Sequence, residues 1–173
     1  ALVGLGHRNS AQSIAAAAAL AARSEAHVGW GAVHALAGRD VVDAVAGLIV
    51  LSRDEDLQVR NWATFGLAQM TEIDSPASRE ALLARITGAD PEVRGEALIG
   101  LSARGEDGVL GPLEQELRGK FHGAWTIQAA DRLGAHGLLP VLVALKSRLE
   151  SRDLHRLGCE LDAANASCRQ GSG

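Results

Sequence analysis

A helix-sized motif occurs twice in this chain. The stretch DLQVRNWATFGL, Asp56 to Leu67, returns as DPEVRGEALIGL, Asp90 to Leu101, with Asp, Val-Arg, Ala, Gly and Leu at matching places. Motifs that recur at a period of roughly 20 to 50 residues are typical of arrays in which each copy is one structural unit that packs on the next. The repeat therefore predicts stacked helical units instead of one irregular core.

Weaker copies extend the pattern through most of the chain. Each copy has an alanine followed four residues later by a leucine, at a period of about 31 to 34 residues: Ala32 and Leu36, Ala63 and Leu67, Ala97 and Leu101, Ala129 and Leu133. ALVGLGHR at residues 1–8 echoes ALIGLSAR at residues 97–104 on the same period. Between the copies lie second apolar segments whose leucines, such as Leu110, Leu113 and Leu117, have helical spacing.

The predicted architecture is all-α, a right-handed α-solenoid of about five helix pairs in a single domain, residues 1–173. We expect its units to be residues 1–22 (partial), 23–53, 54–88, 89–119 and 120–150, with a C-terminal cap and tail at 151–173. The second helix of each pair is expected to line the concave side. SRDLHRLGCELDAANASC, residues 151–168, is expected to add one or two helical turns, and the polar tail RQGSG to stay disordered.

The recurring Asp has a local physical reason. An Asp at a helix N-cap accepts hydrogen bonds from backbone N–H groups of the first turn, which stabilises the helix by about 1 kcal/mol. Asp56 and Asp90 are therefore predicted N-caps, and DSP at residues 74–76 is a similar start for a second helix. Arg60 and Arg94, four residues after each Asp, are expected to pair with that Asp or with a carboxylate of a neighbouring repeat.

These residues resemble the HEAT-like repeats of the phycobilisome lyase family and of bacterial HEAT-repeat proteins more widely. The resemblance rests on Asp56, Val59, Arg60, Ala63 and Leu67 and on the matching Asp90, Val93, Arg94, Ala97 and Leu101. The copies at Ala32 and Ala129 depart from it, because they have Gly29 and Thr126 in place of the arginine. The resemblance implies an α-solenoid and says almost nothing about activity.

Other helical architectures fit less well. Tetratricopeptide units have a similar length, but their pattern of Trp, Gly-Tyr and terminal Pro is missing, and the chain contains no Tyr. The ankyrin signature T-P-L-H-x-A is absent as well. An ordinary helical bundle stays open as an alternative, because repeats can diverge until they are no longer recognisable.

Charge and composition narrow the range of partners and compartments. The net charge is −4 and both signs are interspersed, whereas a surface that follows phosphates is basic and clustered. Two cysteines, Cys159 and Cys168, are too few for a disulfide framework, and the sequence contains neither a membrane-length apolar run nor a secretory signal. We therefore expect a cytoplasmic protein that does not bind membranes and is unlike most nucleic-acid-binding proteins.

The chain begins at Ala1, within an expected first helix, and has no initiator Met. We expect an upstream segment to be missing. Leu2, Val3 and Leu5 would then have no outer neighbour and would form a surface for self-association.

Few residues point to chemistry. His27 and His34 are seven residues apart on one expected helix, but no carboxylate or Cys is placed to complete a metal site with them. The iron-binding HEAT-repeat hydroxylases use His-Glu dipeptides, and this chain has none. No nucleophile elbow, Walker loop or Rossmann fingerprint is present, and GLGHRNS at residues 4–10 belongs to the repeat. We expect no metal, no cofactor and no catalytic residue, while enzymatic activity stays undecided.

The three tryptophans occupy different positions in the repeat. Trp125 aligns with the valines 28, 59 and 93 and is therefore predicted to lie in the core. Trp62 aligns with Gly31, Glu96 and Gln128, at a position predicted to face solvent, whereas the position of Trp30 is ambiguous. Two interpretations of Trp62 stay open: it packs flat against its neighbouring helix, or it acts with the adjacent Phe65 as an interface anchor.

The favoured hypothesis is a non-catalytic scaffold that binds a protein partner along its concave face, because solenoids present extended surfaces and no catalytic constellation is visible. The predicted partner-binding residues are Trp62 and, on the second helices, Arg79, Arg85, Gln115, Glu116, Arg118 and Lys146. Two alternatives stay open. One is a subunit similar to the bilin lyases, with a deep apolar groove for the chromophore, and the other is a DNA-binding protein similar to the HEAT-fold DNA glycosylases.

Overall fold

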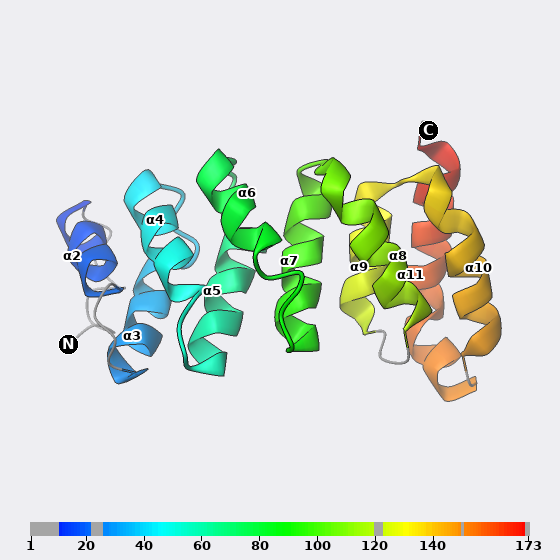
Figure 1. Ribbon diagram of the computed structural model, residues 1–173, viewed down its shortest axis with the longest axis horizontal. Helices are drawn as coiled ribbons and strands as arrows, with labels where there is room; N and C mark the ends of the chain where they lie inside the picture. The colour runs from blue at the N-terminus through cyan, green and yellow to red at the C-terminus, as the bar shows by residue number, and fades with distance from the viewer. Residues whose placement is uncertain (1–10, 22–25, 120–122, 150, 172–173) are drawn as a thin grey trace. The chain divides into compact units, whose positions relative to one another are not determined.

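The structure is a computed structural model that describes residues 11–21, 26–119, 123–149 and 151–171 (Figure 1). These ranges contain α-helices and short 3₁₀ turns and no strand, which confirms the all-α prediction. The α-helices are α2 (Ala11–Ala21), α3 (Ala26–Leu36), α4 (Val42–Leu51), α5 (Leu57–Gln69), α6 (Pro76–Leu83), α7 (Pro91–Ala103), α8 (Leu110–Arg118), α9 (Ala124–Leu133), α10 (Leu139–Arg148) and α11 (Ser151–Gln170). The first repeat copy, with the predicted self-association surface at Leu2, Val3 and Leu5, lies outside the described residues.

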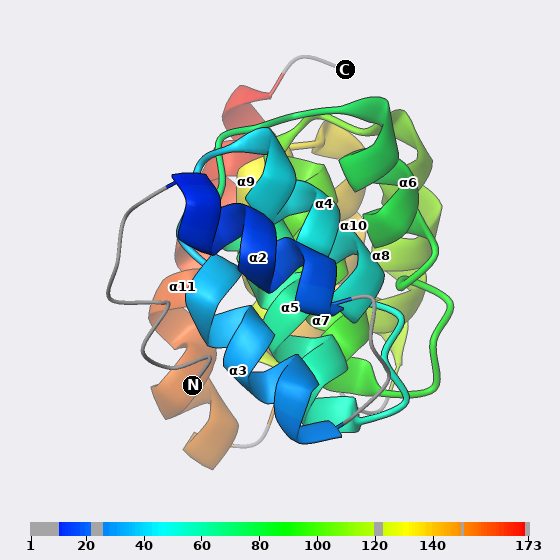
Figure 2. The same ribbon diagram turned by 90° about the vertical axis from the view of Figure 1, so that its left-hand side faces the viewer.

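The chain divides into two compact units, residues 1–97 and 98–173. In the first compact unit, α2 packs on α3 and α4, α3 packs on α5, and α4 packs on α5 and α6. Figure 2, which faces α2, shows that helix in front of its neighbours α3 and α4. In the second compact unit, α9 packs along α11, and α10 packs on both α8 and α11. Each unit therefore consists of helices that contact the next helix and the one after it, as expected for stacked helix pairs.

The motif alanines lie where helices approach each other closely. Ala32, Ala63, Ala97 and Ala129 all have no exposed surface. The leucines that follow them at residues 36, 67 and 101 are also fully buried, whereas Leu133 is half-buried. Equivalent burial at equivalent positions supports the repeat as the organising pattern of the fold.

Close approach is also visible at one glycine of a second helix. A Cβ on Gly47 of α4 would lie 2.5 Å from a methyl group of Leu36 and 3.2 Å from the backbone of Ala18. Any side chain here would push α4 away from α2 and α3, because real side-chain carbons do not approach that closely. The close contact between α4 and its two neighbours therefore requires a glycine at position 47.

The predicted N-caps are confirmed at both strong copies. The carboxylate of Asp56 accepts hydrogen bonds from the N–H groups of Gln58 (2.8 Å) and Val59 (3.2 Å). The carboxylate of Asp90 accepts the equivalent two bonds, from Glu92 and Val93, both at 3.0 Å. Identical hydrogen bonds thus begin α5 and α7.

The motif arginines contact backbone oxygens of the preceding turn, which the sequence did not predict. The Nη1 atom of Arg60 donates to the carbonyls of residues 54 (2.6 Å) and 55 (3.2 Å). The Nη1 atom of Arg94 donates to the carbonyls of residues 88 (2.9 Å) and 89 (2.8 Å). Each arginine therefore closes the turn that leads into its own helix, because a guanidinium offers several donors in a fixed plane.

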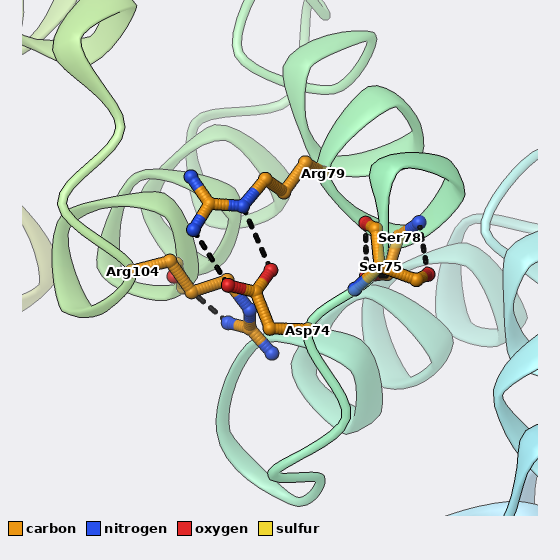
Figure 3. A network of polar contacts seen from close by, with 6 residues as sticks. Asp74, Ser75, Ser78, Arg79 and Arg104 are labelled. Atoms are coloured by element: carbon orange, nitrogen blue, oxygen red, sulfur yellow. Dashed lines mark hydrogen bonds and ion pairs between the residues drawn. The ribbon is translucent and has the colours of Figure 1, made fainter.

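The second helix α6 begins within DSP at residues 74–76, as predicted, but it ends earlier than predicted. Its N-cap is Ser75, which exchanges hydrogen bonds with Ser78 in a capping box, whereas Asp74 forms an ion pair with Arg79 (Figure 3). The helix ends at Leu83, so Arg85 lies in the turn that follows it and not on a second helix.

The C-terminal segment forms a helix of 20 residues, so the expectation of only one or two turns was wrong. Its buried side chains Leu157, Leu161, Ala164 and Cys168 follow helical spacing and pack toward α9 and α10. Arg169 and Gln170, the first two residues of the tail RQGSG, belong to this helix, so the prediction of disorder was wrong for them. Continuous burial of this apolar stripe explains the length of α11, because a helix extends as far as its packed face does.

Within the described residues, no helix is both long enough and apolar enough to cross a bilayer.

Candidate functional site

Four rings from two neighbouring first helices form what we call the aromatic cluster: Trp30 and His34 of α3, and Trp62 and Phe65 of α5. Trp62 is central, with its ring centroid 6.1 Å from that of Trp30 and 5.6 Å from that of Phe65, both in edge-to-face geometry. His34 lies edge-on to Trp30 at 4.7 Å. Edge-to-face contacts of this kind are favourable beyond area burial, so the rings hold one another in place.

The cluster lies at the surface of the first compact unit. Trp30 is 38% exposed and Trp62 is 42% exposed, and His34 is exposed as well. The exposure of Trp62 agrees with the solvent-facing position that its place in the repeat predicts. The ring of Trp62 meets the ring of Trp30 edge to face, so its contact with this neighbouring aromatic side chain is not a flat stack.

A cavity of about 400 Å³, which we call the Trp62 cavity, lies beside the cluster. Its lining residues are Gln58, Asn61, Trp62 and Phe65 of α5 and Glu92 and Glu96 of α7. The four positions on α5 follow the spacing i, i+3, i+4, i+7, and the two on α7 follow i, i+4, so each helix contributes one face. The cavity therefore combines two aromatic rings with two carboxyl groups.

Glu96 is buried, so the prediction that its position faces solvent was wrong. The Nε2 atom of Gln69 on α5 donates a hydrogen bond of 2.6 Å to its Oε2 atom, which holds the side chain between the two helices. Burial raises the pKa of the Glu96 carboxyl, and the negative charge of Glu92 raises it further, while the hydrogen bond from Gln69 acts in the opposite direction. The neutral form is thus favoured more than in an exposed glutamate.

Asn61 contributes a second buried acceptor to the same cavity. Its Oδ1 atom is buried and has no hydrogen-bond partner within the described part of the chain. A buried acceptor without a partner costs roughly 1 to 3 kcal/mol. Such atoms in a native fold call for an explanation, and a ligand donor is one.

A second cavity of about 360 Å³ is lined by Arg60, Arg85, Asp90 and neighbouring apolar residues. Arg85, one of the predicted partner-binding residues, donates from Nη1 to the carbonyl of Ser52 at 2.9 Å. Burial lowers the pKa of its guanidinium, and so do the positive charges of Arg60 and Arg53. Arg85 thus links the turn after α6 to the end of α4.

The other predicted partner-binding residues are distributed over both compact units. Arg79 belongs to the first compact unit, where it pairs with Asp74. The remaining four belong to the second compact unit: Gln115, Glu116 and Arg118 on α8, and Lys146 on α10. Arg118 pairs with Glu114 on its own helix, and Lys146 pairs with Asp162 of α11.

Trp125 is only half-buried, so the prediction of a core tryptophan was wrong. It stands in the first turn of α9, and its ring lies so close to Gly123 that no Cβ would fit on that residue. Val59 and Val93 at the equivalent positions are buried because they are small enough to be covered completely.

The structure gives no support for a metal site at the histidine pair within the side chains that it describes. His34 packs in the aromatic cluster, whereas the side chain of His27 lies outside the described residues. Among the side chains that are described, no group of three or more His, Cys, Asp or Glu is placed to hold a metal ion.

Comparisons with known proteins agree with this fold. Residues 45–123 match the family described as HEAT repeats. Protein YibA of Escherichia coli K12 is 35% identical over 107 residues, which are 62% of this chain and 38% of YibA, and protein YibA of E. coli O157:H7 gives the same values. The chain therefore spans well under half of the length of these curated relatives.

The X-ray structure of E. coli YibA superposes with a TM-score of 0.72 at 23% sequence identity, covering 98% of this chain and 67% of that one. This likeness shows the fold. Together with the all-helical element order and the family match, it supports a HEAT-like repeat protein of the α-solenoid class. The comparisons do not distinguish repeats of the phycobilisome-lyase type from other HEAT repeats.

Proposed function

We propose that this HEAT-like repeat protein is a non-catalytic scaffold and that it binds a protein partner through the aromatic cluster. The observation that carries the proposal is the pair of tryptophans, Trp30 and Trp62, exposed side by side on adjacent first helices. Tryptophan is enriched among the few interface residues that supply most of the binding energy.

The geometry of the cluster suits an anchor. Each ring is restrained by an edge-to-face neighbour, so little side-chain freedom is left to lose when a partner covers it. The cluster lies on first helices, so the proposal moves the principal contact away from the second helices that the sequence favoured. Of the predicted residues, Trp62 is the anchor, and the exposed Gln115 and Arg118 are secondary contact residues. We assign Arg79, Arg85 and Lys146 to the stability of the fold because each bonds to a residue outside its own helix or turn, whereas Arg118 pairs with Glu114 on its own helix.

The two cysteines bear on the cellular location of the protein. Both cysteines are free thiols, which is consistent with a reducing compartment and with the cytoplasmic location that we propose.

The bilin-lyase alternative requires a deep apolar groove, and most of the lining of the Trp62 cavity is polar. A missing absorbance shift on mixing the protein with a bilin would close that alternative.

Affinity capture from the source organism tests the proposal. The wild-type protein is compared with Trp62→Ala and with a control, Val143→Ala, which removes an exposed apolar side chain from α10. We expect Trp62→Ala to lose the proteins that the wild type retains, and Val143→Ala to keep them. Capture that is identical for all three proteins, and equally for Trp30→Ala, would exclude the aromatic cluster as the binding surface.

A further inference from the structure

We infer that the Trp62 cavity binds an arginine side chain of the protein partner, with the guanidinium group against Trp62 and Phe65 and its N–H groups on Glu92, Glu96 and Asn61. This inference rests on the proposed function, because it names the chemistry by which a partner is recognised beside the aromatic cluster.

The charge of the cavity selects a cation. Two of its six lining residues are glutamates, and the described lining includes neither Lys nor Arg. The motif arginine Arg60, which precedes the lining residue Asn61, donates to backbone carbonyls of its own turn. A phosphate group or a partner carboxylate would meet two negative charges here, whereas a cation would meet charges of opposite sign in a partly desolvated site.

The buried carboxyl group of Glu96 also favours a cation as the ligand. Glu96 is held between α5 and α7 by Gln69, and its pKa is raised because burial penalises the charged form. A cation next to Glu96 would offset this penalty and lower its pKa again. An apolar partner side chain would bury the carboxyl further and leave the Asn61 Oδ1 atom without a donor.

The rings favour arginine among the cations. A guanidinium is planar, stacks on aromatic faces and is less strongly hydrated than an ammonium group. It offers five N–H donors, enough to reach carboxylates and an amide oxygen on different sides, whereas a lysine offers three from a single point. The cavity volume of about 400 Å³ lies in the lower part of the range for ligand sites, roughly 300 to 1,000 Å³.

Peptide titration tests the inference directly. The probe is acetyl-Leu-Arg-Leu-amide, and its matched control contains citrulline, which keeps the shape of arginine without its charge. The indole N–H resonances of the tryptophans serve as the readout, assigned with Trp30→Phe, Trp62→Phe and Trp125→Phe. We expect the arginine peptide to shift the Trp62 resonance and to leave the Trp125 resonance unchanged. The citrulline peptide should bind with an affinity at least about fivefold lower.

Protein variants then identify the carboxyl groups. Glu92→Gln and Glu96→Gln should each weaken the arginine peptide about fivefold and remove the preference over citrulline. Glutamine at position 96 can still accept the hydrogen bond from Gln69, so the fold is expected to persist, and a thermal melt checks this. The control is Glu80→Gln, an exposed glutamate of α6 that does not line the cavity, which should bind like the wild type. Equal shifts with the arginine and citrulline peptides would overturn the inference.

The same variants separate this inference from the proposed function. If Trp62→Ala abolishes capture of the partner while Glu92→Gln and Glu96→Gln retain it fully, the aromatic anchor stands and the arginine assignment fails. If none of the three changes capture, the proposed function itself fails. If all three lose capture and Glu80→Gln does not, both are supported.

Discussion

The ring of Trp62 meets the ring of Trp30 edge to face, with centroids 6.1 Å apart and ring planes at 87°. The two residues come from consecutive first helices, α3 and α5, and both stay exposed. The contact therefore joins two repeats at the surface while part of each tryptophan stays accessible to a partner.

This contact predicts a measurable coupling between the two tryptophans. In a double-mutant cycle of Trp30→Ala and Trp62→Ala, the coupling free energy of unfolding should be about 0.5 to 1.5 kcal/mol, because edge-to-face pairs contribute this much beyond burial. Urea denaturation followed by circular dichroism supplies the four stabilities. Strictly additive effects would contradict the pairing.

The two N-caps should be separately and similarly important. Asp56→Ala and Asp90→Ala should each reduce the free energy of unfolding by about 1 kcal/mol, because each leaves two backbone N–H groups of a first turn without their acceptor. Hydrogen exchange should rise at Gln58 and Val59 for the first variant and at Glu92 and Val93 for the second. A charge-matched control is Asp107→Ala, at an exposed position where no side-chain cap is seen. An equal loss in this control would argue against the capping role.

Enlarging a motif alanine should be costly. Ala63 has no exposed surface, so Ala63→Leu forces a larger side chain into a packed helix contact and should destabilise the protein by about 1 to 3 kcal/mol. Ala46→Leu, at an exposed position of α4, makes the same chemical change without a packed neighbour and should stay within about 0.5 kcal/mol. Thermal denaturation of the two variants and the wild type measures these changes. An Ala63→Leu variant as stable as Ala46→Leu would show that position 63 is not closely packed.

Glu96→Gln should stabilise the fold at neutral pH. The folded-state pKa of Glu96 is raised above its ordinary value of 4.5, so the charged form, which prevails at high pH, is disfavoured in the folded state. Removing that charge should raise the melting temperature at pH 7. The gain should shrink as the pH falls through the raised pKa and vanish well below the ordinary pKa of 4.5, where the glutamate is protonated in both states.

The control for this pH dependence is Glu80→Gln, because Glu80 is exposed. Its effect on the melting temperature should be small at every pH. A Glu96→Gln variant that is less stable than the wild type at pH 7, or a gain that grows toward low pH, would show that Glu96 acts as a stabilising carboxylate instead.

Arg148 should stabilise the second compact unit through carbonyl groups at the end of α8. It donates from Nη2 to Leu117 (2.9 Å) and from Nη1 to Arg118 (3.2 Å), which places a cation at a helix C-terminus. Arg148→Met should therefore cost about 1 to 2 kcal/mol. Arg132→Met, at an exposed position in the last turn of α9, removes the same charge and should cost less. Urea denaturation measures the free energy of unfolding of both variants. Similar decreases in both would show that Arg148 stabilises the protein through its charge and not through these hydrogen bonds.

The parts of the fold that could be predicted are those settled over short distances along the chain. The Asp56 and Asp90 caps close hydrogen bonds to residues two and three positions later, so their sequence pattern is sufficient to locate them. The length of α11 and the early end of α6 could not be predicted in this way. Both depend on how far neighbouring helices cover the segment, and short-range propensity contains no information about that coverage.

The candidate site was only partly predictable for the same reason. Repeat alignment placed Trp62 at the surface and Phe65 beside it, but it also placed Glu96 at the surface, where the structure has it buried against Gln69. Alignment transfers the orientation of a backbone position, and burial depends on which side chain the next helix offers.

By itself, the sequence determined that the chain is all-helical, that its helices come in repeating pairs, and that Asp56 and Asp90 begin two of them. These are consequences of periodicity and of hydrogen bonds within one turn. Only the tertiary structure decided that Trp62 contacts Trp30 and also lines a cavity with Glu96, because these residues come from three different helices. Stacking successive first helices brings together side chains that no local pattern connects.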